Sequence, residues 1–344
     1  MKRVGIVGCG NWGCTVANLV ATGIDACEFT SEVEVYVHET EVECDGVTMK
    51  LSEAIMKKRQ NPVFLPGIRI RDEIVAITDT KRISEWDVVI ICIPCKYLHM
   101  LSNVKFKSDA ILVSLTKGLV LHQDTLLTPS MYIHEISGKT CSSLQGANIA
   151  SEVARGVLSE CVLSSSSSQD REILCRLFVK SRFKVLNIEY DPCIEVYGAV
   201  KNIIALGYGI LEGLGGHVGE NTKAFYFGRG CREIQKFVEV LGYTGNHFFE
   251  SCGVGDVFVS CLHGRNAHAG KEIAMQFCIG KEDYRCDFST WRQQHMQGVE
   301  TVAVVYEYLA AKNLSAKFDL ITIIYQILYH NADPQELYIY LEKN

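Results

Sequence analysis

Lys201 is a charged residue in an otherwise apolar segment, GAVKNIIALGYGILEGLG, in which the next downstream charge is Glu212. Desolvation disfavours the ammonium form of a lysine and lowers its pKa, which suits the side chain to proton transfer near neutral pH. Asn202 follows directly and adds a hydrogen-bonding group. The alternative is a structural lysine whose ammonium group reaches solvent at the end of its flexible stem. The segment alone supports both interpretations.

Four further polar side chains share one short segment, SCGVGDVFVSCLHGRN: Asp256, Ser260, Arg265 and Asn266. A carboxylate among small and apolar residues is costly to bury without a cation, so we expect Asp256 to pair with Lys201. Arg265 and Asn266 lie in a glycine-flanked turn and are suited to holding a phosphate through charge-assisted hydrogen bonds. Lys117 follows an apolar strand-like run, and open α/β sheets bind ligands at the carboxyl ends of their strands.

A glycine-rich motif near the N-terminus predicts dinucleotide binding. Its residues match G-x-G-x-x-G: Gly8, Cys9, Gly10, Asn11, Trp12 and Gly13. The motif follows a predicted strand and opens a predicted helix, as phosphate binding at a helix N-terminus requires. Gly8 would permit the tight turn, Gly10 the approach of a pyrophosphate, and Gly13 close helix–strand packing. The alternative is a glycine-rich turn without a ligand.

The segment after the second predicted strand favours NAD over NADP. It reads VHETEVE over residues 37–43, and no Lys or Arg occurs before Lys50. NADP needs a cation for its 2′-phosphate, whereas an acidic residue accepts the ribose hydroxyls of NAD. Glu39 is the candidate acceptor, although its distance from the glycines exceeds the usual spacing of about 20 residues.

The elements that must position these residues alternate in the first half of the chain. Nearly continuous β-branched and apolar runs are typical of parallel strands covered on both faces. They occupy residues 4–8, 33–37, 74–78, 87–93 and 110–115, with weaker runs at 142–145, 161–163 and 183–188. Helical spacing occurs between them. This alternation predicts an α/β fold with a doubly wound, Rossmann-type sheet.

Helical patterns dominate the second half, at residues 193–214, 222–241, 298–312, 319–329 and 335–341. We therefore predict two domains: a dinucleotide-binding domain over 1–190 and an all-helical substrate and catalytic domain over 191–344. The five-serine tract Ser164–Ser168 is interpreted as a polar loop between a strand and a helix rather than as a phosphorylation site.

Composition excludes several classes of protein. The net charge of −6 and the lack of a long basic run argue against binding nucleic acid or an anionic membrane by bulk charge. Fifteen cysteines, an odd number and partly inside apolar runs, indicate a reducing cytoplasmic compartment. Glycines interrupt the uncharged stretch 4–24, so neither a signal peptide nor a membrane span is expected. Cys92 and Cys95 form a C-x-x-C that we interpret as structural, and no metal site is expected.

The chain resembles the NAD-dependent glycerol-3-phosphate dehydrogenase family across nearly its whole length. The matching stretches are GNWG (10–13), FLPG (64–67), TKG (116–118), GANIASEVA (146–154), GAVKNIIALGYGILEGL (198–214), SCGVGD (251–256), GRN (264–266) and QGVET (297–301). The resemblance implies NAD-dependent interconversion of sn-glycerol 3-phosphate and dihydroxyacetone phosphate, and a cytoplasmic homodimer.

The resemblance also implies roles for individual residues. Lys201 corresponds to the proton-transferring lysine, with Asp256 as its partner. The substrate-binding positions are Lys117, Asn202, Asp256, Ser260, Arg265 and Asn266. The NAD-contacting positions are the glycine loop, His38, Tyr97, Ala150, Arg265 and Gln297. The chain departs from the family pattern at His38, where phenylalanine is frequent, at Ser260, where threonine is usual, and at His263 and His295, which replace glycine and lysine.

Two other functions stay open at this point. The first is another two-domain NAD-dependent hydroxy-acid dehydrogenase, similar to 6-phosphogluconate dehydrogenase. The second is a non-catalytic NAD(H)-binding sensor. The joint presence of Lys201, Asp256 and Arg265 argues against the sensor, because cofactor sensing requires none of them.

Overall fold

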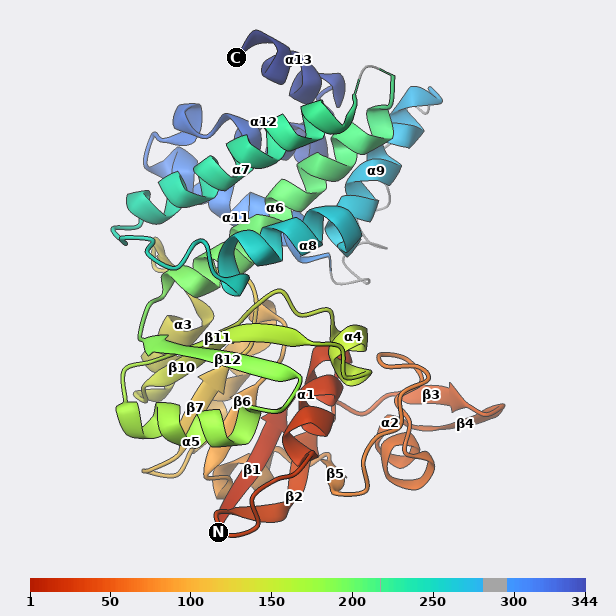
Figure 1. Ribbon diagram of the computed structural model, residues 1–344, viewed down its shortest axis with the longest axis vertical. Helices are drawn as coiled ribbons and strands as arrows, with labels where there is room; N and C mark the ends of the chain where they lie inside the picture. Colours follow the sequence, from red (N-terminus) through yellow and green to blue (C-terminus); the bar gives the residue numbers. More distant parts are fainter. Residues whose placement is uncertain (217, 281–295) are drawn as a thin grey trace. The chain divides into compact units, whose positions relative to one another are not determined.

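A computed structural model describes residues 1–216, 218–280 and 296–344 of the chain. The chain folds into two compact units (Figure 1). The first comprises Met1–Thr116 and Pro129–Asp191, and the second comprises Lys117–Thr128 and Pro192–Asn344. The segment 117–128 therefore belongs with the second unit, whereas the predicted division near residue 190 places it in the first.

An eight-stranded sheet forms the centre of the first unit, in the order β12-β11-β10-β7-β6-β1-β2-β5. The strands are β1 Lys2–Val7, β2 Phe29–Tyr36, β5 Ile74–Ile77, β6 Val88–Ile91, β7 Ile111–Ser114, β10 Cys141–Gln145, β11 Ser159–Ser165 and β12 Phe183–Glu189. All neighbouring pairs are parallel except β10 and β11, which are antiparallel. The predicted α/β class and Rossmann-type sheet are confirmed, with the last two strands reversed.

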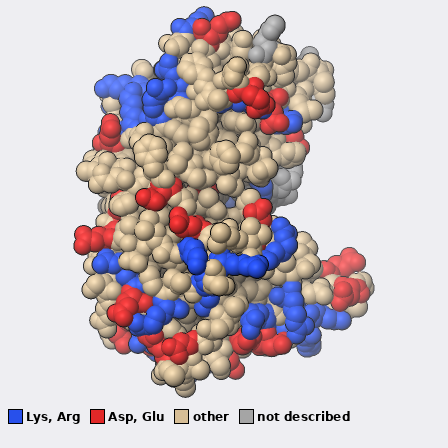
Figure 2. Space-filling model, viewed as in Figure 1, with Lys and Arg blue, Asp and Glu red and all other residues tan. Residues whose placement is uncertain are grey.

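Helices and short turns connect these strands. They are α1 Asn11–Ala21, α2 Leu51–Glu53, α3 Pro129–Ser137, α4 Ala150–Ala154 and α5 Ser168–Phe178, with a π-helical turn at Ala54–Lys58 and 3₁₀ turns at Thr80–Glu85 and Cys95–Asn103. The hairpin of β3 (Glu41–Cys44) and β4 (Val47–Lys50) precedes α2. Glu41, Glu43 and Asp45 of this hairpin are exposed. Figure 2 shows acidic side chains gathered in this part of the surface.

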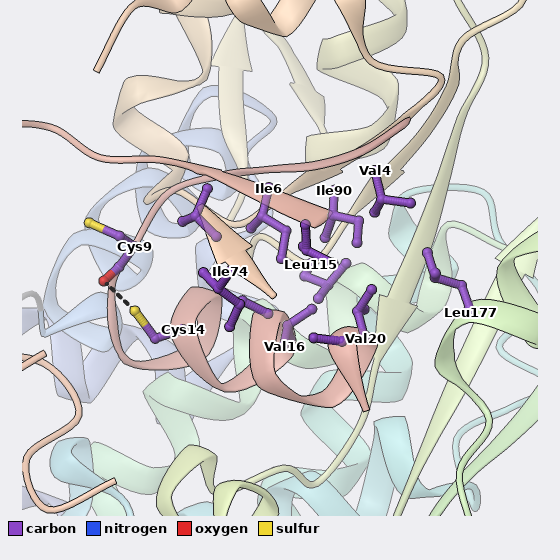
Figure 3. Packing of buried hydrophobic residues seen from close by; sticks show 14 of the residues in the cluster. Val4, Ile6, Cys9, Cys14, Val16, Val20, Ile74, Ile90, Leu115 and Leu177 are labelled. Atoms are coloured by element: carbon purple, nitrogen blue, oxygen red, sulfur yellow. Dashed lines mark hydrogen bonds between the residues drawn. The ribbon is translucent and has the colours of Figure 1, made fainter. Parts of the chain in front are cut away.

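The core of the first unit explains the continuous apolar character of its central strands. All four residues of β6 and all four of β7 are buried. Side chains of α1, including Val16 and Val20, pack with Ile6 of β1 and Ile90 of β6 (Figure 3). Because both faces of these strands are covered, polar residues do not alternate with apolar ones along them.

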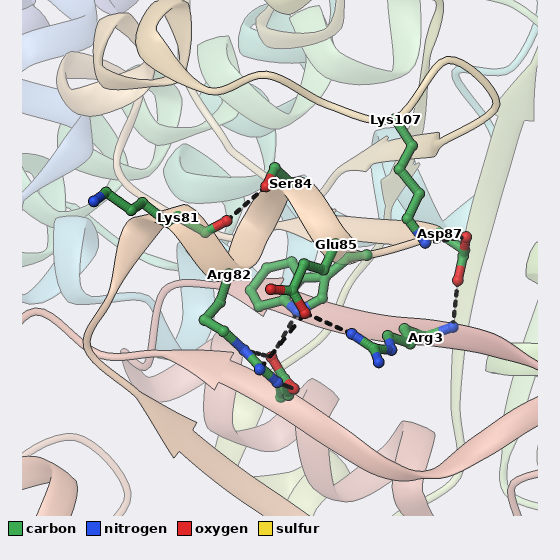
Figure 4. Close-up of polar contacts among 9 residues, drawn as sticks. Arg3, Lys81, Arg82, Ser84, Glu85, Asp87 and Lys107 are labelled. Atoms are coloured by element: carbon green, nitrogen blue, oxygen red, sulfur yellow. Dashed lines mark hydrogen bonds and ion pairs between the residues drawn. The ribbon is translucent and has the colours of Figure 1, made fainter.

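A polar network occupies the amino ends of β1 and β6 (Figure 4). Arg82 pairs with the buried Glu34, which also accepts a hydrogen bond from Trp86 Nε1 at 2.8 Å. Asp87 accepts hydrogen bonds from the backbone N–H of Arg3 at 2.7 Å and from Lys107 Nζ at 2.6 Å. The glycine loop follows the other end of β1, so this network stabilises the sheet without belonging to the loop.

The serine tract does not form the predicted loop over its full length. Ser164 and Ser165 are buried residues of β11, and Ser168 begins α5. Ser167 caps α5, because its side chain accepts a hydrogen bond from the N–H of Asp170 at 3.1 Å. Only Ser166 and Ser167 lie between the two elements. Ser164 Oγ instead forms hydrogen bonds with the backbone of Glu189 and Asp191, and Ser167 satisfies its side chain at the helix N-cap. Serine is compatible with both positions, which is why composition alone predicted too long a loop.

The second unit is helical apart from one hairpin, β8 (Val120–His122) and β9 (Thr125–Leu127). Its helices are α6 Cys193–Leu214, α7 Glu220–Val240, α8 Asp256–His263, α9 Arg265–Cys278, α11 Gln297–Ala311, α12 Asp319–His330 and α13 Gln335–Lys343. A π-helical turn at Ser251–Gly255 precedes α8, and a 3₁₀ turn occupies Ser315–Lys317. Helices α8 and α9 were not predicted from the sequence.

Helix α6 forms the core of this unit, because every residue from Cys193 to Leu211 is buried. A Cβ at Gly209 would lie 1.8 Å from the carbonyl oxygen of Ala267, so the glycine permits close contact with α9. By length and composition α6 is the one helix in the described ranges that could cross a membrane. The core helix of a soluble protein passes the same test, and the apolar window of α6 is entirely buried within the unit.

Candidate active site

Lys201 forms a buried ion pair with Asp256 in the second unit. Lys201 lies on α6 and is 6% exposed, and Asp256 is the first residue of α8 and 2% exposed. Lys201 Nζ donates to Asp256 Oδ1 at 2.5 Å and to Ser260 Oγ at 2.7 Å. Asp256 and Ser260 are four residues apart on one helix and therefore share a face. The predicted pairing of Lys201 with Asp256 is confirmed.

A second lysine shares the same carboxylate. Lys117 Nζ donates to Asp256 Oδ2 at 2.6 Å, so one carboxylate accepts from two ammonium groups. The side chain of Lys117 is 23% exposed and that of Lys201 7%. This contact was not predicted from the sequence, because residues 117 and 256 are 139 positions apart. The signal that could have indicated it is that Asp256 is an isolated acidic residue between apolar runs, with two oxygens to satisfy.

The environment of Lys201 lowers its pKa from the ordinary lysine value of 10.5 to about 7. Burial is the largest cause, since it disfavours the charged form. The positive charge of Lys117 lowers the pKa further, and the negative charge of Asp256 opposes both effects. Near neutral pH, both the ammonium and the amine forms of Lys201 are therefore populated. A group in that condition can both give and take a proton.

Asn202 and Asn266 connect three helices beside this ion pair. Asn266 Nδ2 donates to Asn202 Oδ1 at 2.9 Å, and Asn266 Oδ1 accepts from the backbone N–H of Gly298 at 3.0 Å. Asn202 Nδ2 donates to the carbonyl oxygen of Gly198 at 3.2 Å. The two amides thereby join α6, α9 and the start of α11. Gln297, the first residue of α11, donates from Nε2 to the carbonyl oxygen of Lys117 at 3.5 Å.

Arg265 is the exposed first residue of α9, directly after Gly264. The first turn of α9 contains no acidic residue. Helix N-termini present backbone N–H groups and partial positive charge, which favour a bound anion. A guanidinium group and the amide of Asn266 at this position suit the recognition of a phosphate. His263 is exposed at the end of α8, and His295 lies outside the described residues.

The glycine loop in the first unit has the geometry that a pyrophosphate requires. Gly8 has a φ of +113°, and a Cβ there would lie 2.5 Å from the carbonyl oxygen of Cys92. A Cβ at Gly13 would lie 2.1 Å from the carbonyl oxygen of Gly8. By contrast, a Cβ at Gly10 would meet nothing within 4 Å. Helix α1 begins at Asn11, and its first turn has no acidic residue. The open space at Gly10, at a helix N-terminus, fits the phosphates of NAD.

The other residues predicted to contact NAD, apart from Arg265 and Gln297, lie in the same unit as the glycine loop. Tyr97 is 40% exposed in the turn Cys95–Asn103, and Ala150 begins α4. The carbonyl oxygen of Ala150 accepts from Thr15 Oγ1 of α1 at 3.2 Å. His38 is exposed after β2. The carboxylate of Glu39 accepts from the N–H of Ser52 at 3.1 Å and from Ser52 Oγ at 2.6 Å, so it holds the start of α2.

The thiols near the glycine loop are poorly suited to reactive chemistry. Burial raises the pKa of Cys9 to about 11 and that of Cys14 to about 12, and it raises the pKa of Cys92 as well. A raised pKa keeps a thiol protonated and unreactive at neutral pH. No disulfide is present within residues 1–216, 218–280 and 296–344. Across those same ranges, no group of three or more His, Cys, Asp and Glu side chains could hold a metal ion.

Comparison with known proteins decides the family. The sequence model for the NAD-dependent glycerol-3-phosphate dehydrogenase N-terminus matches residues 3–171, and that for the C-terminus matches residues 192–338. The glycerol-3-phosphate dehydrogenase [NAD(+)] of Pichia angusta is 34% identical to this chain over 355 residues, covering 97% of this chain and 90% of that relative. The chain belongs to the NAD-dependent glycerol-3-phosphate dehydrogenase family. It follows from this family that the protein is an oxidoreductase and that its cofactor is NAD.

Further relatives support this assignment over the whole chain. The cytoplasmic glycerol-3-phosphate dehydrogenase [NAD(+)] of Drosophila ezoana is 32% identical, covering 97% of this chain and 95% of that relative. The structure of glycerol-3-phosphate dehydrogenase from Saccharomyces cerevisiae has a TM-score of 0.84 at 31% identity and covers 99% of both chains. The Dunaliella salina structure has a TM-score of 0.91 at 30% identity, and this chain spans 66% of its length. A 6-phosphogluconate dehydrogenase-like assignment is therefore not supported.

Proposed function

We propose that this protein interconverts sn-glycerol 3-phosphate and dihydroxyacetone phosphate, with Lys201 as the group that donates and accepts the proton. The observation that carries the assignment to Lys201 is its buried contact with Asp256 and Ser260. Burial of Lys201, together with the positive charge of Lys117, lowers the lysine pKa to about 7, although the charge of Asp256 opposes this shift. A structural ion pair would not require an ammonium group so close to its neutral form. General acid–base catalysts are most effective when their pKa lies near the working pH.

In the reducing direction, the ammonium group of Lys201 gives its proton to the carbonyl oxygen of dihydroxyacetone phosphate. NADH, held at the glycine loop, would supply the hydride for the carbonyl carbon, so that the products are the secondary alcohol and NAD⁺. Asp256 orients the ammonium group through its 2.5 Å contact, and Ser260 Oγ accepts a second N–H at 2.7 Å. One N–H of Lys201 is then left for the substrate oxygen. In the reverse direction, the neutral amine takes the alcohol proton.

Arg265 and Asn266 are proposed to hold the substrate phosphate at the N-terminus of α9. Asn266 is fixed by its contacts with Asn202 and Gly298, so its orientation is set before the substrate binds. Fixing the phosphate in this way would hold the reacting carbon in a productive orientation, which lowers the entropic cost of reaching the transition state. Lys117, Asn202 and Ser260 complete the proposed substrate-binding set. The proposed NAD-contacting residues are the glycine loop, His38, Tyr97, Ala150, Arg265 and Gln297.

We also propose that the protein acts in the cytoplasm as a homodimer. The Drosophila ezoana relative is named cytoplasmic, which supports the same compartment for this chain. The homodimer rests on the family resemblance, and sedimentation equilibrium of the purified protein tests it. A single species at the monomer mass of 38.4 kDa across micromolar concentrations would contradict it.

The reaction is tested by following NADH absorbance with purified protein and dihydroxyacetone phosphate. We expect NADH oxidation that depends on that substrate and the formation of sn-glycerol 3-phosphate as the product. NAD⁺ reduction with 6-phosphogluconate in place of sn-glycerol 3-phosphate would contradict the proposed substrate. Tight NADH binding without turnover of any of these substrates would instead indicate a non-catalytic sensor.

A further inference from the structure

Asn61 is a fully buried polar residue in contact with the glycine loop. Its exposed fraction is 0%. Its Nδ2 donates to the carbonyl oxygen of Cys9 at 2.9 Å, and its Oδ1 accepts from the backbone N–H of Phe64 at 3.0 Å. The side chain thus joins the second residue of the glycine motif to a segment more than fifty positions away in the sequence. Burial of an amide is costly unless its hydrogen bonds are made, and here both ends are satisfied.

The thiol of Cys14 takes part in the same arrangement. Cys14 Sγ donates to the carbonyl oxygen of Cys9 at 3.1 Å, the contact drawn in Figure 3. Asn61 Nδ2 also lies 3.1 Å from Cys14 Sγ. The Cys9 carbonyl therefore accepts two hydrogen bonds from the interior of the unit. Its direction is fixed by two side chains, neither of which is part of the G-x-G-x-x-G pattern that predicts phosphate binding.

The direction of this carbonyl determines that of the next N–H. Peptide bonds are planar and trans, so the C=O of Cys9 and the N–H of Gly10 point in opposite directions. No cis peptide bond is present within the described ranges. Because Asn61 and Cys14 hold the carbonyl toward the interior, the Gly10 N–H is turned away from them. Gly10 is also the position at which a Cβ would meet open space.

We propose that Asn61, assisted by Cys14, is a positioning residue that orients the Cys9–Gly10 peptide so that the Gly10 N–H is presented to the pyrophosphate of NAD. This inference rests on the NAD-binding function. Without Asn61 the Cys9–Gly10 peptide can rotate. Restoring its orientation when NADH binds costs free energy, which weakens NADH binding. The effect acts on the cofactor and does not involve the lysine cluster of the second unit.

Asn18 provides a matched control. It lies on α1, and its side chain makes the same pair of contacts with the segment that follows Asn61. Asn18 Nδ2 donates to the carbonyl oxygen of Arg69 at 3.0 Å, and Asn18 Oδ1 accepts from the N–H of Arg71 at 3.0 Å. Replacing either asparagine by alanine removes one bond to a carbonyl and one from an N–H, and Asn61→Ala also removes the contact with Cys14 Sγ. Only Asn61 contacts the glycine loop.

The experiment measures the NADH Kd by fluorescence titration and the melting temperature for the parent protein, Asn61→Ala and Asn18→Ala. We expect both variants to melt at lower temperature. We expect the Kd to rise by about tenfold or more in Asn61→Ala and to stay within about twofold of the parent in Asn18→Ala. The KM for NADH should rise with the Kd, whereas the KM for dihydroxyacetone phosphate should not. Equal Kd values for both variants would overturn the proposal.

Cys14→Ala keeps the test decisive if Asn61→Ala does not fold. It removes one of the two donors to the Cys9 carbonyl and leaves Asn61 in place, so we expect the NADH Kd to rise by about two- to fivefold. An unchanged Kd in Cys14→Ala would overturn the proposal in that case. Failure of the parent protein to bind NADH would instead contradict the proposed function, so the two failures are distinguishable.

Discussion

Lys117 Nζ lies 2.6 Å from Asp256 Oδ2, so the carboxylate that holds Lys201 is shared with a second lysine. Two cations on one anion leave a net positive charge in a buried site, which disfavours full protonation of the more buried lysine. Burial of Lys201 and repulsion from Lys117 lower its pKa, whereas attraction to Asp256 raises it. Removing the charge of Lys117 and removing that of Asp256 should therefore shift the Lys201 pKa in opposite directions.

Lys201→Ala tests proton transfer directly. We expect kcat for reduction of dihydroxyacetone phosphate to fall by at least the ~10²–10⁴-fold typical of general acid–base catalysis. The NADH Kd should stay close to that of the parent, because the glycine loop belongs to the other unit. Stopped-flow absorbance gives kcat, and fluorescence titration gives the Kd. A well-folded variant that binds NADH and turns over near the parent rate would refute the proposed role.

Asp256→Asn tests the sign of the carboxylate effect. The amide keeps the size but removes the negative charge that raises the Lys201 pKa, so that pKa should fall below about 7. Carbonyl reduction requires the ammonium form, so its rate decreases as pH rises through the lysine pKa. The decrease should therefore occur at lower pH in the variant than in the parent. A kcat–pH profile measured at saturating substrates reports this shift, and a shift to higher pH would contradict it.

Lys117→Met should move the same profile in the opposite direction. Removing the positive charge of Lys117 removes one cause of the lowered Lys201 pKa, so the decrease in reduction rate should occur at higher pH. Lys117→Arg is the matched control, since it keeps the charge and should leave the profile near that of the parent. Both variants are expected to raise the KM for the substrate. The test therefore compares kcat at saturating substrate, which a change in KM does not affect. The coupling would be disproved by identical profiles for the Met and Arg variants.

Arg265→Ala tests the phosphate contact. We expect kcat/KM for dihydroxyacetone phosphate to fall by about 10–100-fold, equivalent to the ~1.5–3 kcal/mol of a hydrogen bond to a charged group. Unphosphorylated dihydroxyacetone, a much poorer substrate, should lose far less. A partial rise in the KM for NADH is expected, because Arg265 is also a proposed cofactor contact. Equal losses for the two substrates would assign Arg265 to the cofactor or to the structure alone.

Cofactor choice gives a further test. Glu41 and Glu43 are exposed on β3, Glu39 lies at the start of the same connection, and no Lys or Arg occurs between residues 37 and 49. These carboxylates would repel a 2′-phosphate, so we expect kcat/KM to be substantially higher with NADH than with NADPH. Steady-state rates with each cofactor at fixed dihydroxyacetone phosphate measure this ratio. A ratio near one would show that these residues do not select the cofactor.

Local patterns in the sequence were sufficient for the fold class, the positions of the main strands in the first half and the limits of α6. The run from Val88 to Ile91 predicted a buried strand because both of its faces are covered. The glycine loop was recognisable because its chemistry is contained within six consecutive residues, Gly8–Gly13. The isolated charge of Lys201 in an apolar helix likewise indicated a desolvated lysine. Each of these features depends on residues that lie close together in the sequence, so a local pattern is enough to predict it.

Only the tertiary structure decided which distant groups meet. Asp256 also accepts a hydrogen bond from Lys117, which is 139 positions away, and periodicity carries no information about such a pairing. The same holds for Asn61, whose contact with Cys9 spans 52 positions. Segment 117–128 belongs with the helical unit because its contacts, rather than its composition, place it there. Long-range contacts depend on how complete elements pack, and each carboxylate or amide in a sequence has many possible partners until that packing is known.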